Sequence, residues 1–184
     1  MVSIFTGVAG RFGVNEREAE RFFKFAVVGV IGFIVDFGIF NLTLRPFELL
    51  LENGTALHSF LVGLGLNDEQ TISLARTFAS TLSFIAAIIS NFMWNRYWTY
   101  PDSRSRSIRR QLAQFTLVSV AGILIRVPII TYAHTPFTNL VATIPALEAY
   151  SVRIGDNLAL MLAVVVVMFW NFFVNRYWTY NDVN

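Results

Sequence analysis

The chain has no cysteine and very few charged residues. The absence of cysteine excludes a disulfide framework and a thiolate nucleophile. Charged residues make up only 14% of the 184 positions, against roughly a quarter in a soluble domain, whereas hydrophobic residues reach 55%. So apolar a chain is far from the composition of a soluble domain. The composition therefore predicts an all-α membrane protein.

Four apolar runs are long enough to cross a bilayer, which takes about 20 helical residues for roughly 30 Å of hydrocarbon. Inside lipid the backbone must satisfy its own hydrogen bonds, so each run is predicted to be a transmembrane helix. Charge is nearly absent from them: the first run holds Asp36, the third holds Arg126, and the other two hold none. The runs are Phe25–Leu44, Thr77–Asn95, Gln111–Ala133 and Asn157–Asn175.

Positive charge is concentrated on one side of the four runs, and this distribution predicts the orientation. Cytoplasmic loops of membrane proteins carry an excess of Lys and Arg. Both termini and the basic loop Pro101–Arg110 are therefore expected in the cytoplasm, with the protein passing four times through the inner or plasma membrane. The basic residues on that side are Arg11, Arg17, Arg21, Lys24, Arg96, Arg104, Arg106, Arg109, Arg110 and Arg176, against Arg45, Arg76 and Arg153 on the other.

A ten-residue sequence occurs twice, each time at the end of an apolar run. Asn91–Tyr100 reads NFMWNRYWTY and Asn171–Tyr180 reads NFFVNRYWTY, so most positions are identical. The preceding helices match more weakly, with Gly32 aligned to Gly122 and Asp36 to Arg126. The pattern predicts two duplicated two-helix units that point the same way across the membrane. The repeats are residues 24–100 and 111–180, within one membrane domain at 24–184.

Residues 1–23 are predicted to be a cytoplasmic amphipathic segment. Asn15 is a helix N-cap residue with an acid three positions on, and Glu20 and Lys24 are spaced as a favourable helical pair. Such a helix would lie on the membrane surface. On the opposite side, the connection His134–Asp156 contains two prolines and is expected to be partly irregular.

Asp36 and Arg126 are the two ionisable residues deep in the predicted spans. Charges at that depth cost at least a few kcal/mol, so both are expected to face the bundle interior or a watered cavity. One interpretation is an ion pair that fixes helix packing. The other is that Arg126 receives a substrate phosphate, for which a guanidinium is well suited, and that Asp36 is its resting partner. Pro128 removes one helical hydrogen bond and could open the helix near Arg126.

The repeated decapeptides place asparagine, arginine and tryptophan at matching positions. Interfacial aromatic belts and the positive-inside rule account for much of this composition. Asparagine in a span is costly unless hydrogen-bonded, so the amides are either interhelical contacts or ligands for a headgroup. The candidate substrate-binding residues are Asp36, Arg126, Asn91, Asn95, Arg96, Trp98, Asn171, Asn175, Arg176 and Trp178.

Other signals of chemistry are weak or missing. His58 and His134 have no neighbouring ligands at metal spacing, and no phosphate-binding glycine loop or nucleophile elbow is present. We expect no metal, no cofactor, no enzymatic activity and no nucleic-acid partner. The basic loop before Gln111 is a topology signal that could also attract anionic membrane lipids.

The four spans, the basic central loop and span ends of the form N-x-x-x-N-R-x-W-x-Y resemble the GtrA-like family. The start of the first span, Phe22–Gly29 followed by Asp36, is also similar to that family. The resemblance implies translocation of polyprenyl-phosphate-linked sugars, such as undecaprenyl-phosphate sugars, for cell-surface polysaccharide synthesis. It also implies a membrane glycosyltransferase as partner. It assigns motif roles to Asp36 and to the asparagines and arginines of both decapeptides, whereas Arg126 comes from the internal alignment.

Two other functions remain open at this point. A small proton-coupled exporter would use Asp36 as its titrating acid, but a partner Arg126 would hold that acid ionised. A membrane anchor or accessory subunit of a glycosyltransferase would need no transport path at all. Four helices form a thin wall around a headgroup, which leaves room for a homodimer or a larger assembly.

Overall fold

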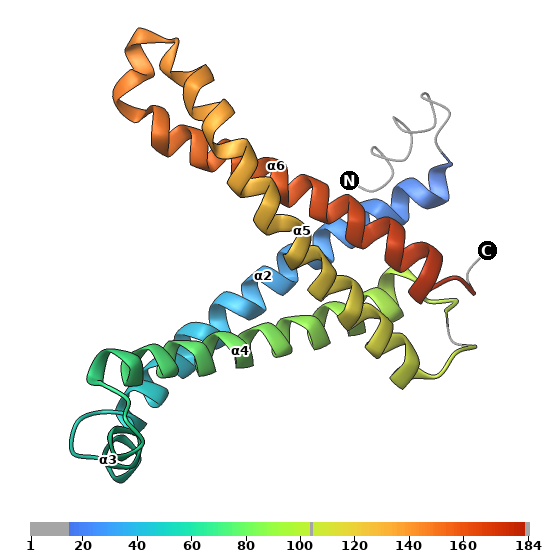
Figure 1. Ribbon diagram of the computed structural model, residues 1–184. Coiled ribbons are helices and arrows are strands. Elements are labelled where there is room, and N and C mark those ends of the chain that lie inside the picture. Colours follow the sequence, from blue (N-terminus) through green and yellow to red (C-terminus); the bar gives the residue numbers. More distant parts are fainter. Residues whose placement is uncertain (1–14, 104, 183–184) are drawn as a thin grey trace. The chain divides into compact units, whose positions relative to one another are not determined.

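The computed structural model describes residues 15–103 and 105–182, and over these residues every regular element is helical. Four helical segments are long and apolar enough to cross a membrane, which confirms the predicted all-α membrane protein. In chain order the elements are α2 (Glu16–Leu50), α3 (Ala56–Gly63), α4 (Asp68–Trp94), η1 (Asn95–Thr99), α5 (Ile108–Ala142), η2 (Pro145–Tyr150), α6 (Ser151–Val174) and η3 (Asn175–Thr179) (Figure 1).

The helices extend well beyond the apolar runs. At 35 residues, α2 is about 52 Å long, against roughly 30 Å of hydrocarbon. It starts early because its polar first turns are good helix formers. The Asn15 side chain accepts a hydrogen bond from the backbone N–H of Arg17 at 2.9 Å, and Lys24 pairs with Glu20 at 2.6 Å, as predicted. Residues 16–23 are thus continuous with the first span. Residues 1–14 of the proposed surface segment lie outside the described residues.

The prolines do not interrupt α5. Pro128 and Pro136 both lie inside the helix, which is also 35 residues long. Each ring removes one backbone hydrogen bond, but the neighbouring bonds of so long a helix hold it together. Only Thr143 and Ile144 separate α5 from the 3-10 helix η2, which starts at Pro145. The expectation of an opened helix near Arg126 is therefore wrong, and the irregular part of the connection is shorter than predicted.

The chain forms two compact units, Met1–Thr99 and Tyr100–Asn184. In unit 1, α2 packs along α4, with the short α3 between them in sequence. In unit 2, α5 packs along α6 (Figure 1). Each unit is therefore built around a pair of long helices.

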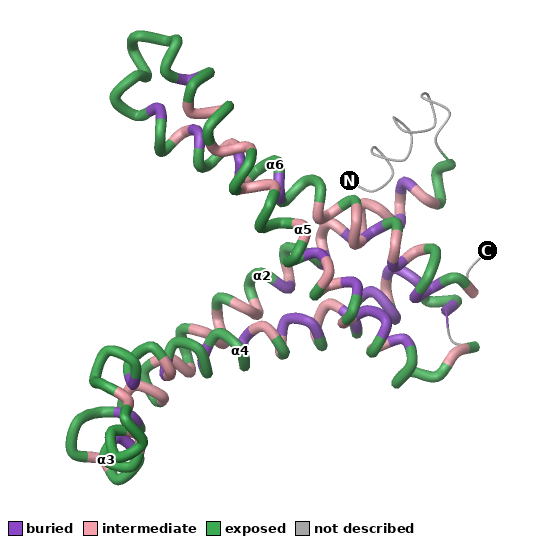
Figure 2. Tube along the Cα trace, in the orientation of Figure 1, coloured by how far each residue is buried: buried purple, intermediate pink, exposed green. Residues whose placement is uncertain are grey.

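Buried positions recur along the second helix of each unit (Figure 2), and those at every fourth position carry small side chains. Helices in lipid gain no hydrophobic drive from association, so close backbone approach at small residues supplies the packing energy instead. The residues on the other sides are long and apolar, and many are exposed, which suits contact with lipid tails. The buried small residues are Thr71, Ala75, Ala79, Ser83 and Ala87 on α4, and Ser151, Gly155, Ala159 and Ala163 on α6.

The first helices of the two units bury residues at matching positions. In α2 the buried residues include Arg21, Phe25, Val28 and Gly32, and in α5 they include Gln111, Phe115, Val118 and Gly122. Each member of the second set lies ninety positions after its counterpart in the first. Three of the four positions carry the same residue, whereas the fourth changes from arginine to glutamine.

Candidate functional site

The second helix of each unit ends in a π-helical turn with the sequence Asn-Arg-Tyr-Trp-Thr. α4 leads into η1 and α6 leads into η3. At the end of η3, the backbone N–H of Tyr180 donates to the carbonyl oxygen of Asn175 at 2.8 Å, five residues back. Turns of this kind are rare and are frequently found at functional sites. The repeated sequence therefore forms a specific backbone feature in addition to an aromatic belt.

The asparagine that begins each π turn is buried and bonds back to its own helix. Asn95 Nδ2 donates to the carbonyl oxygen of Asn91 at 2.9 Å, and Asn175 Nδ2 donates to that of Asn171 at 2.8 Å. In unit 2 the side-chain oxygen of Asn175 also accepts from Thr179 Oγ1 at 2.8 Å. These two amides thus hold the start of the π turn in place.

Unit 1 leaves the matching acceptors open. Asn91 Oδ1, Asn95 Oδ1 and Thr99 Oγ1 are buried, and none has a hydrogen-bond partner within the described part of the chain. An unsatisfied buried polar atom costs about 1–3 kcal/mol. Water or the hydroxyl groups of a bound molecule are natural donors to such oxygens. These atoms are shielded from solvent by the packed helices, so in this arrangement a buried water is the donor that fits them.

The other asparagine of each pair faces a glycine on the first helix. A Cβ atom placed on Gly32 would lie 2.2 Å from Asn91 Oδ1, and one on Gly122 would lie 3.0 Å from Asn171 Nδ2. The first distance excludes a Cβ unless Asn91 moves, whereas the second is a tight contact. The structure thus joins two features that the sequence shows separately, the paired glycines and the first asparagines, and it gives Asn91 and Asn171 a role in helix packing.

Trp98 lies beside a cation from the start of the first span. The Lys24 ammonium is 5.9 Å from the centroid of the Trp98 ring, within cation–π range. Arg96 is only 7% exposed. The contact between Lys24 and Trp98 could have been predicted from the sequence, because Lys24 immediately precedes the first apolar run and Trp98 follows the end of the second. Helices that run antiparallel across one membrane place such residues at the same level.

Unit 2 has no cation at the position that matches Lys24. Arg176 is half-buried and lies 5.6 Å from the Tyr177 ring centroid, while Trp178 is exposed. The residue aligned with Lys24 is Gln114, which is 8% exposed. The two π turns are therefore alike in backbone and in arginine, but they differ in the side chains that α2 and α5 bring to them.

Asp36 is half-buried in unit 1 and accepts a hydrogen bond from Ser83 Oγ at 2.6 Å. Ser83 lies on the small-residue stripe of α4, eight positions before Asn91, so its place on the same helical face could have been read from the sequence. The matching position in α6 is Ala163. Arg126 is exposed on α5 in unit 2. The proposed pairing of Asp36 with Arg126 joins two different units and stays a prediction.

The central loop of unit 2 is tied to the C-terminal residues. Asp182 accepts hydrogen bonds from Ser103 Oγ and Ser105 Oγ, both at 2.5 Å, and Tyr100 stacks on Tyr180 with ring centroids 4.4 Å apart. Burial alone would raise the pKa of Asp182. The two serine hydroxyls outweigh that effect, with a smaller contribution from nearby positive charge, and lower the pKa below its ordinary value of 3.8.

Within residues 15–103 and 105–182, no group of three or more His, Asp or Glu residues is placed to hold a metal ion. The two histidines instead each pair with one aspartate. His58 Nε2 lies 3.1 Å from Asp68 Oδ1, and His134 Nδ1 lies 2.5 Å from Asp156 Oδ1.

Residues 24–180 match the family model described as the GtrA/DPMS transmembrane domain. Among similar proteins, a dolichol-phosphate mannosyltransferase of Pyrococcus furiosus is 31% identical over 107 residues, or 58% of this chain and 23% of that enzyme. The uncharacterized membrane protein YngA of Bacillus subtilis is 25% identical over 114 residues, or 61% of this chain and 58% of that protein. The chain thus aligns with under a quarter of the first relative and somewhat over half of the second.

Proposed function

The chain belongs to the GtrA/DPMS transmembrane domain family, and from this premise we propose that it moves a polyprenyl-phosphate-linked sugar from one membrane leaflet to the other. The polyprenyl tail stays in lipid while the phosphate and the sugar pass along polar residues of the helices. No nucleotide site is part of this proposal, so movement is downhill or coupled to another process. The product serves cell-surface polysaccharide synthesis or modification.

The observation that carries the proposal is the pair of π turns with matching arginines. Arg96 and Arg176 each follow a buried asparagine at the end of a long apolar helix. A guanidinium can hold a phosphate through two parallel hydrogen bonds. In unit 1 the buried oxygens Asn91 Oδ1 and Asn95 Oδ1 lie within two helical turns of Arg96 and have no hydrogen-bond partner among the described residues, and we propose that they accept from sugar hydroxyls when the substrate separates the helices. The phosphate and the sugar thus find complementary groups at one end of the unit.

Trp98 and Trp178 are the aromatic residues of the proposed substrate site at the π turns. Trp98 lies next to Lys24 and packs edge-on against Trp94, with ring centroids 6.2 Å apart. A flat aromatic face pairs well with the apolar C–H face of a sugar ring, and the ammonium adds a second phosphate contact. In unit 2, Trp178 is the matching residue and is more exposed.

Polar residues deeper in the helices extend the proposed path. Asp36 and Ser83 form the hydrogen-bonded pair inside unit 1. We propose that Arg126 receives the phosphate partway across and that Asp36 is its partner when no substrate is bound. An ionised residue within a span is by default a candidate functional residue, because its burial in lipid is so costly.

The proposed orientation places both termini and both π turns in the cytoplasm, with units 1 and 2 as parallel repeats. The excess of basic residues on that side supports it. So do the buried residues of α2 and α5, which match at a constant spacing of ninety. The cytoplasmic leaflet of the plasma membrane is then the leaflet from which the substrate is taken.

A second candidate function is an anchoring or accessory role beside a polyprenyl-phosphate glycosyltransferase. It is favoured by the similarity to part of the dolichol-phosphate mannosyltransferase, because the aligned segment is under a quarter of that enzyme. In either case the partner would be a membrane glycosyltransferase that makes the lipid-linked sugar. A homodimer would enlarge the wall around a moving headgroup.

Purified protein in liposomes, with a polyprenyl-phosphate sugar in the membrane, separates the two functions. We expect sugar movement to fall at least tenfold in Arg126→Ala and in Ser83→Ala, because each removes a polar group from the path. Arg153→Ala changes an exposed arginine at the opposite end of α6 from its π turn and is the matched control. Equal movement in wild type and Arg126→Ala would refute the proposed path.

Co-purification with a glycosyltransferase is the companion measurement. An anchor would bind the enzyme tightly, and its lipid movement would equal that of protein-free vesicles. Loss of movement only in Asp36→Asn, together with pH-dependent efflux of cationic dyes, would instead identify a proton-coupled exporter.

A further inference from the structure

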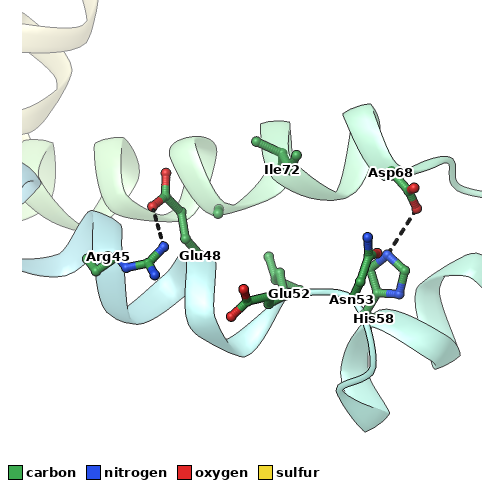
Figure 3. A pocket seen from close by; sticks show the side chains of 9 residues that line it. Arg45, Glu48, Glu52, Asn53, His58, Asp68 and Ile72 are labelled. Atoms are coloured by element: carbon green, nitrogen blue, oxygen red, sulfur yellow. Dashed lines mark hydrogen bonds and ion pairs between the residues drawn. The ribbon is translucent and has the colours of Figure 1, made fainter.

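Unit 1 contains a pocket of about 220 Å³ at the end opposite its π turn (Figure 3). Typical sites for drug-sized ligands occupy about 300–1,000 Å³, so this pocket suits a smaller molecule. Its walls come from the end of α2, the segment that follows, α3 and the start of α4. The lining residues are Arg45, Glu48, Leu51, Glu52, Asn53, His58, Asp68, Ile72 and Ala75.

The pocket exists because the chain turns sharply twice between α2 and α4. Gly54 and Gly65 adopt positive φ angles of 93° and 96°, a region that favours glycine. Between them α3 is a short helix that Thr55 caps, and the next helix begins with a capping box of Asn67 and Gln70. These turns set α3 beside the start of α4, where His58 reaches Asp68.

Two ionic contacts leave one carboxylate and one amide free in the pocket. Figure 3 shows Arg45 with Glu48 on one side, at 3.5 Å, and His58 with Asp68 on the other, at 3.1 Å. Glu52 and Asn53, by contrast, have no side-chain hydrogen bond to any described residue. A carboxylate accepts from two hydroxyls, and an amide both donates and accepts.

The remaining walls and the overall charge narrow the class of ligand. Ile72, which is 47% exposed, supplies the accessible apolar surface of the lining, suited to the C–H face of a ring, whereas Leu51 and Ala75 are almost fully buried behind it in the protein. Three carboxylates against one guanidinium and one imidazole give the pocket an excess of negative charge. That charge disfavours a phosphate and favours a neutral or amine-bearing polyhydroxyl ring.

The matching end of unit 2 is closed by close helix packing. A Cβ atom on Gly155 would lie only 2.7 Å from the backbone nitrogen of Thr138, so α5 and α6 are nearly in backbone contact there. The second connection also has no counterpart of α3, because η2 follows α5 after two residues. The pocket is therefore a feature of unit 1 and of its longer connection.

We propose that this pocket binds the sugar ring of the transported lipid-linked sugar after it has crossed the membrane. The assignment of the ring to a transported sugar rests on the proposed function. Glu52 and Asn53 hold neighbouring hydroxyls, and Ile72 supports the ring face. The phosphate stays outside the pocket, so the sugar is presented to the outer side with its lipid still in the bilayer.

Saturation-transfer NMR on the whole protein in nanodiscs tests the site with water-soluble probes. The probes are methyl mannopyranoside and the methyl glycoside of glucosamine, each titrated without any lipid substrate. We expect saturation transfer to the ring protons of both, with the amine-bearing probe binding several-fold more tightly. The double substitution Glu52→Gln, Asn53→Ala should weaken binding at least tenfold. Both residues are exposed, so the fold is retained.

Glu148→Gln is the control, because it removes an exposed carboxylate in η2, outside the pocket, and should leave binding unchanged. Binding that survives the double substitution, or that inorganic phosphate displaces, would overturn the proposal. These measurements distinguish a failure of the pocket proposal from a failure of the proposed translocation. Soluble glycosides test binding to the pocket without any movement of lipid. If the chain moves lipid-linked sugar but does not bind glycosides, only the pocket proposal is wrong.

Discussion

Substituting Gly32 by alanine tests whether the Gly32–Asn91 contact sets the distance between α2 and α4. The new Cβ would lie 2.2 Å from Asn91 Oδ1 and 2.3 Å from its Nδ2, far inside van der Waals contact. Overpacking of this kind costs about 1–3 kcal/mol. The gain in helix propensity from glycine to alanine offsets about 0.5–1 kcal/mol of that. We therefore expect a net loss of about 1–2 kcal/mol in the free energy of unfolding.

The same substitution in an Asn91→Ala background should change the free energy of unfolding in the opposite direction. Without the amide there is no clash, so Gly32→Ala should stabilise that background by about 0.5–1 kcal/mol. The two effects correspond to a coupling free energy of about 2 kcal/mol between Gly32 and Asn91. Gly38→Ala is the matched control on α2, because a Cβ there meets nothing within 4 Å, and it should be mildly stabilising in both backgrounds.

The assay is equilibrium unfolding of the purified protein in mixed micelles, followed by circular dichroism. A smaller loss is expected for Gly122→Ala, whose nearest contacts are at 3.0 Å. The reasoning fails if Gly32→Ala behaves like Gly38→Ala in the wild-type background. It also fails if the cost of Gly32→Ala persists after Asn91 is removed.

Two further predictions concern unit 2. Gly155→Ala should lower the free energy of unfolding by about 2–3 kcal/mol, because its Cβ meets the Thr138 backbone, which cannot rotate away; an unchanged midpoint in the same unfolding assay would contradict this. The lowered pKa of Asp182 means that its contacts stabilise the fold above pH 3.8 and that this contribution is lost as the pH falls through the lowered value. In a carboxyl ¹³C NMR titration, removing the hydroxyls of Ser103 and Ser105 together should raise the midpoint of Asp182, and an unmoved midpoint would show that those hydroxyls do not set it.

Much of the fold could be predicted from the sequence because it depends on composition and local pattern. The four apolar runs required helices, and Asn15 and Glu20–Lys24 were readable from spacing. The ends of the helices were not, because hydropathy marks where lipid begins and not where helical hydrogen bonding stops. Polar segments such as 16–23 continue α2, and α5 passes through Pro136.

The candidate residues could be named from the sequence, but their neighbours could not. Periodicity shows that Asn91 and Asn95 share a face, yet helix rotation decides that Asn91 meets Gly32. Ser83 donates to Asp36, but it is one of five hydroxyl residues in its apolar run, and the sequence does not distinguish it from the other four. The π turns could not be predicted from the sequence either, because their i→i+5 hydrogen bonds have no known residue signature.

The pocket of unit 1 could not be predicted from the sequence, for a related reason. His58 and Asp68 are ten residues apart and come together only because Gly54 and Gly65 turn the chain. The connection between the first two apolar runs is rich in leucine and phenylalanine. It gave no indication that Glu52 and Asn53 would face a cavity.

The most direct test of the account is leaflet-to-leaflet movement of a radiolabelled polyprenyl-phosphate sugar in liposomes that contain only the purified chain. A glycosidase added outside reports the sugar that has reached the outer leaflet. We expect movement well above that of protein-free vesicles, and its loss when Arg96 and Arg176 are both replaced by alanine. Movement no faster than in protein-free vesicles would contradict it.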